Sequence, residues 1–79
     1  MWWMFEKLFE KGPVVFYAYS RGNRNLDGKV SINRDTKEIE LVSPSSDDAG
    51  IQFAEDKAIE KASLMIQYKY PQQRQVACG

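Results

Sequence analysis

The spacing of apolar residues along the chain predicts six elements in the order α-β-β-β-α-β. In the first, residues 2–11, Trp2, Phe5 and Phe9 are three and four positions apart and share one helical face with Leu8 beside them, and Glu and Lys residues lie on the other side. This period is typical of an amphipathic helix, so we expect a short helix here. The Gly12-Pro13 pair ends it, because proline disfavours helical backbone in the residue before it.

The strongest strand pattern is the run over 14–19, which is β-branched and aromatic and is apolar on both of its faces. Such a run is typical of a central strand that is covered on both sides. Two shorter runs, 29–33 and 38–41, alternate between apolar and polar residues, and the segment 34–37 between them predicts a tight turn. Together these runs predict a β-meander over 13–43.

A long helix is predicted over 46–69, with Asp47 and Asp48 as caps at its start. Its apolar stripe contains small residues four positions apart, Ala54, Ala58 and Ala62, which allow a helix to approach a sheet closely. A short last strand is expected over 74–78.

These elements predict a single α+β domain over residues 1–79, built on a mainly antiparallel four-stranded sheet that packs against the long helix. Counting strands along the chain, we expect the order 4-1-2-3. This order makes the first strand an interior strand, which explains why both of its faces are apolar. The alternative places the last strand beside the third and leaves the first strand at an edge.

Catalytic and metal chemistry is disfavoured by the composition, because the chain has no histidine and its one cysteine is Cys78. Histidine is the side chain that ordinarily titrates near neutral pH, and most zinc sites need His, several Cys, or both. The Asp47-Asp48 pair has no calcium-loop spacing after it. We therefore expect a protein that is not an enzyme and that binds no cofactor or metal.

Charge and hydropathy narrow the kinds of partner. Eleven basic and eleven acidic side chains cancel, so the overall field does not drive the chain onto nucleic acid or anionic lipid. The apolar run that begins the sequence is five residues long, which is too short for a membrane span. The single cysteine fits a reducing compartment. We expect a cytoplasmic protein that makes no use of a membrane.

The predicted function is that of a small accessory domain that acts through a protein surface, with a homodimer as one form. Two adjacent tryptophans are hard for a small domain to hide, since they point in different directions. Residues of the long helix that fall beside its main stripe can extend the same surface. The candidate binding surface consists of Trp2, Trp3, Phe5, Phe53 and Leu64.

The alternative is a weak nucleic-acid-binding module. It would use the basic loop over 20–34 together with a tyrosine-bearing sheet face, because aromatic side chains on a sheet can stack single-stranded bases. No phosphate-loop or RNA-recognition motif accompanies these residues. The residues of this alternative surface are Tyr17, Tyr19, Arg21, Asn23, Arg24, Lys29 and Arg34.

Overall fold

The computed structural model describes residues 2–21, 25–45 and 52–77, with side chains over 54–76 in the last range. These residues form a five-stranded sheet and one helix. The strands are β1 (Trp2–Lys11), β2 (Val14–Arg21), β3 (Gly28–Asn33), β4 (Ile39–Ser43) and β5 (Gln73–Ala77), and the helix is α1 (Gln52–Gln67). The order across the sheet is β4-β3-β2-β1-β5, and all neighbouring strands are antiparallel.

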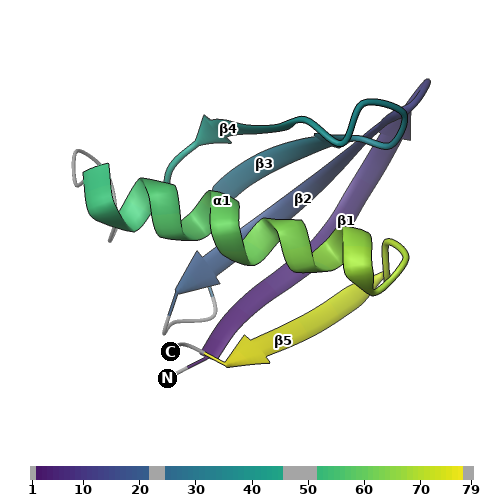
Figure 1. The fold of residues 1–79 in the computed structure, drawn as a ribbon. Helices are drawn as coiled ribbons and strands as arrows, with labels where there is room; N and C mark the ends of the chain where they lie inside the picture. The colour runs from purple at the N-terminus through teal and green to yellow at the C-terminus, as the bar shows by residue number, and fades with distance from the viewer. Residues whose placement is uncertain (1, 22–24, 46–51, 78–79) are drawn as a thin grey trace.

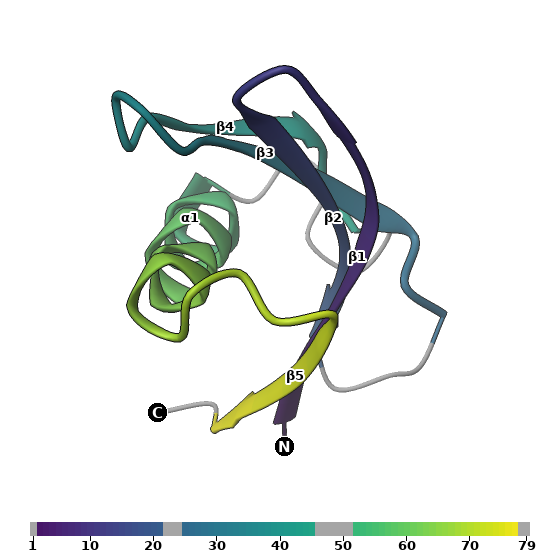
Figure 2. The same ribbon diagram turned by 90° about the vertical axis from the view of Figure 1, so that its right-hand side faces the viewer.

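The molecule has two layers, because α1 runs across one face of the twisted sheet (Figure 1). A view from the side shows that the sheet curves around the helix and that its other face has no helix on it (Figure 2). In the described part of the chain, no helix is long and apolar enough to cross a membrane.

The core lies between the helix and the sheet. Alternate residues of the strands point toward α1, and the small alanines of the helix let the two layers come close. The fully buried core residues are Trp3, Phe5, Val15, Tyr17, Tyr19, Val30, Ile32, Ala58, Ala62 and Met65. Within this core the ring of Tyr19 stacks against both Trp3 and Phe5, with centroids 6.1 and 6.0 Å away.

The predicted fold is wrong in two respects. Residues 2–11 form the strand β1 instead of a short helix, and the sheet therefore has five strands instead of four. The physical reason is that β1 fills the free edge of β2, where eight of its ten residues pair with that strand. Trp3 and Phe5 then alternate toward the helix, which gives two large side chains a buried environment.

The predicted position of the last strand is also wrong, because β1 occupies the place beside β2. The predicted order 4-1-2-3 places the last strand beside β2, whereas β5 pairs with β1.

A β-bulge between Lys7 and Phe9 explains why the alternation in β1 is hard to see in the sequence. The extra residue, Leu8, interrupts the two-residue period halfway along the strand.

The remaining elements lie close to the predicted positions. β3 and β4 form the expected hairpin around residues 34–37. In its turn Asn33 accepts hydrogen bonds from the backbone N–H groups of Asp35 and Thr36, and Lys37 takes a positive φ of 68°. Asp47 and Asp48, proposed above as helix caps, lie outside the described residues, as does Cys78.

Candidate functional site: the open face of the sheet

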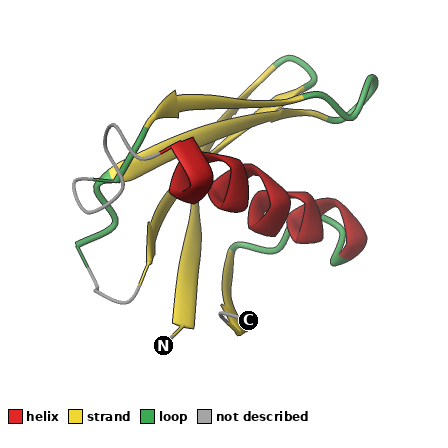
Figure 3. Cartoon of the chain, turned by 60° about the vertical axis from the view of Figure 1, so that its left-hand side comes forward, coloured by secondary structure: helices red, strands yellow, loops and turns green. Residues whose placement is uncertain are grey.

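The sheet face that α1 leaves uncovered is called the open face here (Figure 3). Residues that oppose one another on neighbouring strands share a face, so the pairing register identifies its members. One row across β1, β2, β3 and β4 consists of Phe9, Phe16, Ser31 and Glu40. A second row consists of Glu6, Ala18 and Lys29, and a third of Lys11, Val14 and Asn33.

The open face carries large apolar side chains that remain in contact with solvent. Trp2 is 55% exposed, Phe9 is 50% exposed and Val42 is 49% exposed. The rings of Phe9 and Phe16 stack at 4.5 Å between centroids with 19° between their planes. Leu8, the extra residue of the bulge, is also exposed. Phe9 and Phe16 thus form an aromatic platform on a part of the sheet that no other described element covers, and Trp2 and Val42 lie elsewhere on the same face.

A groove of about 760 Å³ adjoins this platform and crosses β3 between β2 and β4. Its apolar walls come from β2 and β4, and Glu38 and Glu40 place two carboxylates at its rim. Ser31 and Asn33 of β3 also line it, and its apolar residues are Val14, Phe16, Ile39, Leu41 and Val42. The groove is partly open to solvent.

Four charged residues are placed on the open face by the register: Glu6, Lys11, Lys29 and Glu40. With Glu38 of the groove, three acidic groups stand against two basic ones, so this face has no excess of positive charge. None of the four forms an ion pair with another residue in the described part of the chain. Glu6 and Lys29 lie on either side of the small, buried Ala18.

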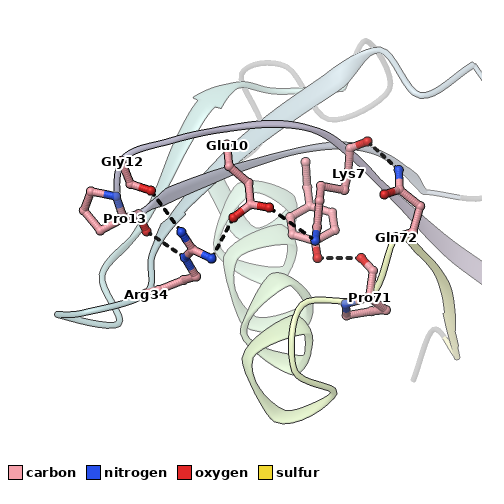
Figure 4. A network of polar contacts seen from close by, with 8 residues as sticks. Lys7, Glu10, Gly12, Pro13, Arg34, Pro71 and Gln72 are labelled. Carbon is pink, nitrogen blue, oxygen red and sulfur yellow. Dashed lines mark hydrogen bonds and ion pairs between the residues drawn. The ribbon is translucent and has the colours of Figure 1, made fainter.

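A network of polar contacts at one end of the molecule has a different character (Figure 4). Arg34 forms an ion pair with Glu10 at 2.6 Å and donates hydrogen bonds to the carbonyls of Gly12 and Pro13. These contacts join the β3–β4 turn to the end of β1 and to the β1–β2 turn. Because the polar groups of the network bind each other, we assign it a structural role.

Tyr17 belongs to the same network through its hydroxyl, which donates a 2.6 Å hydrogen bond to the carbonyl of Pro71. Lys7 and Gln72 bind each other through two further hydrogen bonds beside it. Burial raises the pKa of Tyr17 to about 12, and the charge of Glu10 and the hydroxyl of Tyr70 act in the same direction. A phenol held neutral in this way is a hydrogen-bond donor and no base at physiological pH.

The candidate binding surface predicted from the sequence is divided by the fold. Trp2 lies exposed, whereas Trp3 and Phe5 are fully buried in the core. Leu64 is partly buried and packs against that core. The side chain of Phe53 lies outside the described side chains. Among the members whose side chains are described, Trp2 is thus the one most open to a partner.

The residues of the alternative nucleic-acid surface are not brought together either. Tyr17 and Tyr19 are fully buried beneath α1, and the Tyr19 hydroxyl accepts a hydrogen bond from the backbone N–H of Ser45. The Arg21 guanidinium lies 6.0 Å from the centroid of the Trp3 ring, while Arg34 is held at the opposite end of the sheet. Lys29 is on the open face, and Asn23 and Arg24 lie outside the described residues.

Sequence reasoning missed Phe9, Phe16 and Val42 as surface residues. The alternation in β2 contains the relevant signal, because Val14, Phe16 and Ala18 fall on the opposite side from Tyr17 and Tyr19. With one helix available to cover the sheet, one of these two sets has to face outward. The helix covers the tyrosines, whose hydroxyls find partners at the edge of the core.

Among the described residues, no group of three or more His, Cys, Asp or Glu side chains gathers in an arrangement that could hold a metal ion. Comparison of the chain with models of protein families, with curated proteins and with solved structures found no match.

Proposed function

We propose that this protein is a non-catalytic interaction domain that binds a protein partner through the open face. The observation that carries the proposal is the exposed aromatic platform of Phe9 and Phe16, with Trp2 and Val42 on the same side of the sheet. Aromatic side chains are enriched in the centres of protein interfaces. The cost of leaving several large apolar groups in water is offset when a partner covers them.

The charge of the open face favours a protein over a nucleic acid. A surface that binds phosphate backbone needs an excess of Lys and Arg, whereas Lys11 and Lys29 are accompanied by Glu6, Glu38 and Glu40. The tyrosines that would have supplied the stacking surface are buried. These observations support the protein-binding proposal and remove the main argument for the alternative.

Photo-crosslinking in living cells tests the proposal. A photoreactive phenylalanine analogue placed at Phe9 preserves the aromatic ring on the open face, and the same analogue at the exposed Ser63 of α1 is the matched control. We expect protein adducts from position 9 and none of comparable yield from position 63. Equal yields, or an adduct at position 9 whose mobility changes on nuclease treatment, would contradict the proposal.

A further inference from the structure

We propose that the partner on the open face is a second copy of this chain, related to the first by a two-fold axis that runs parallel to β2. This inference rests on the proposed function of the open face and specifies its occupant. In the arrangement, Lys29 of each protomer pairs with Glu6 of the other.

The argument starts from the positions of Glu6 and Lys29. Both residues pair with Ala18 of β2. Glu6 lies on the neighbouring strand β1, and Lys29 lies on the neighbouring strand β3. Adjacent strands are about 4.8 Å apart, so the two residues lie at similar distances on opposite sides of β2. Both are half-buried, and neither forms an ion pair with any other residue that the structure describes.

A two-fold axis parallel to β2 and above the open face keeps each residue at its level along the strand and exchanges the β1 side for the β3 side. Lys29 therefore faces Glu6 of the second copy, and the contact occurs twice. Ala18 faces its own copy on the axis, where its small side chain leaves room for the two long ones. Two sheets packed face to face with nearly aligned strands form an ordinary β-sandwich.

The other rows fit the same operation. Phe9 of one copy faces Ser31 of the other, which sets a large side chain against a small one. Lys11 faces Asn33, so no like charges meet. A two-fold axis perpendicular to the strands through the row of Phe16 would instead place Glu40 against itself. The axis parallel to β2 is the one that brings Lys29 and Glu6 of two copies together, and we take it as the proposed arrangement for that reason.

The size of the face predicts a weak dimer. β2 has eight residues and the sheet has five strands, so at ordinary rise and strand spacing the face measures roughly 27 by 24 Å, or about 650 Å² in projection. Stable interfaces bury about 800 Å² of accessible surface on each partner. We therefore expect a weak dimer whose population depends on protein concentration.

Charge exchange between two chains provides the test. In Glu6→Lys both positions of the pair are positive, and in Lys29→Glu both are negative, so each variant alone repels its own copy. In an equimolar mixture, each Lys of the first variant faces a Glu of the second, and both cross-chain pairs are restored. The exposed Asp35 in the β3–β4 turn gives the control Asp35→Lys, which makes the same charge change away from the open face.

Sedimentation and native mass spectrometry with one variant isotopically labelled measure the outcome. We expect each single variant to dimerise at least about tenfold more weakly than the wild type. The mixture is expected to recover heterodimers at nearly the wild-type affinity, and Asp35→Lys to behave as the wild type. An ion pair formed within one chain could not produce this recovery, because mixing leaves each chain's own charges unchanged.

A wild-type chain that stays monomeric at millimolar concentration would overturn the inference, as would a mixture that does not associate better than its components. The crosslinking experiment separates this failure from that of the proposed function. Adducts from position 9 to a different protein would retain the open face as a binding surface and reject the second copy. The absence of any adduct from that position would reject both.

Discussion

At the scale of single residues, the two adjacent tryptophans have opposite environments. Trp3 is fully buried against Tyr19, with the guanidinium of Arg21 over its ring, whereas Trp2 points to the open face and is more than half exposed. Successive side chains of a strand point to opposite faces of the sheet, and α1 covers one of these faces only. The same residue type therefore serves the core at one position and the surface at the next.

Alanine substitutions at these two positions should separate the two roles. Trp3→Ala removes a fully buried aromatic side chain and should lower the free energy of unfolding by about 3–5 kcal/mol. Trp2→Ala, measured at protein concentrations too low for association, should change it by less than about 0.5 kcal/mol. Urea denaturation followed by circular dichroism measures both. Similar losses in the two variants would mean that the faces of β1 are assigned incorrectly.

Gly28 is a second position at which the identity of one residue affects packing of the core. It lies opposite Tyr19 on the neighbouring strand, and a Cβ atom there would overlap the Tyr19 ring. That ring cannot move aside, because it is stacked between Trp3 and Phe5 and its hydroxyl accepts a hydrogen bond from Ser45.

Gly28→Ala should therefore destabilise the protein by about 1–3 kcal/mol through overpacking. The control is Gly12→Asn, since Gly12 has a φ of +58° that asparagine tolerates and nothing lies within 4 Å of its Cβ position. We expect the control to cost less than about 1 kcal/mol. A thermal melt of each variant decides between overpacking at Gly28 and a general intolerance of glycine replacement.

At the scale of elements, α1 depends on small residues where it faces the sheet. Ala54, Ala58 and Ala62 are buried at successive turns of this helix, and Met65 fills the space at its far end. Close packing of this kind tolerates little added volume.

Ala58→Leu should lower the free energy of unfolding by about 1–3 kcal/mol, because three additional carbon atoms have to fit between the helix and the sheet. Gln67→Leu introduces the same side chain at an exposed position of the same helix and should have little effect. Denaturant titrations of the two variants give the comparison. Equal stability of Ala58→Leu and the wild type would show that the helix approaches the sheet less closely than described.

Local sequence patterns were enough to predict α1, β2, the β3–β4 hairpin and the last strand, because each has an uninterrupted period and clear turn residues. They were not enough for β1. Trp2, Phe5 and Phe9 have helical spacing, and the bulge at Leu8 conceals the two-residue alternation. What decides the structure of this segment is the pairing of β1 with β2 and β5, which is a tertiary effect that no local window contains.

Only part of the candidate site could be predicted from local sequence patterns, because its β1 residues depend on strand pairing. The outward set of β2 is visible in the sequence, but its partner Phe9 shares the open face because of the bulge. Trp3 and Phe5 were expected at a surface, and pairing along β1 turns them toward the helix instead.

At the scale of the whole molecule, the network around Tyr17 joins the β1–β2 hairpin, the β3–β4 turn and the segment that leads from α1 to β5. The pKa of Tyr17 is raised from 10.0 to about 12 in the folded protein. Its stabilising contribution is complete below pH 10, where the hydroxyl is protonated in both states. It is lost as the pH rises toward 12, because the unfolded chain releases the proton first.

We therefore expect the free energy of unfolding to fall between pH 10 and pH 12, by up to about 1.4 kcal/mol per pH unit from this group. Tyr17→Phe should be less stable at neutral pH, where it lacks the hydrogen bond to Pro71, but should show a shallower fall in the alkaline range. Tyr68→Phe, at an exposed tyrosine, keeps the buried hydroxyl and should retain the steep fall. Urea titrations at several pH values provide the data, and parallel curves for wild type and Tyr17→Phe would contradict the assignment.

The place of β1 in the sheet has a consequence for synthesis on the ribosome. β1 pairs on one side with β2, which follows it after a two-residue turn, and on the other side with β5, which starts at Gln73. The hairpin can form early in translation, but the second edge of β1 stays unpaired until nearly the whole described chain has been made. An unpaired edge on an aromatic strand is a template for pairing with other chains. We therefore expect the nascent polypeptide to need protection from aggregation until β5 has been made.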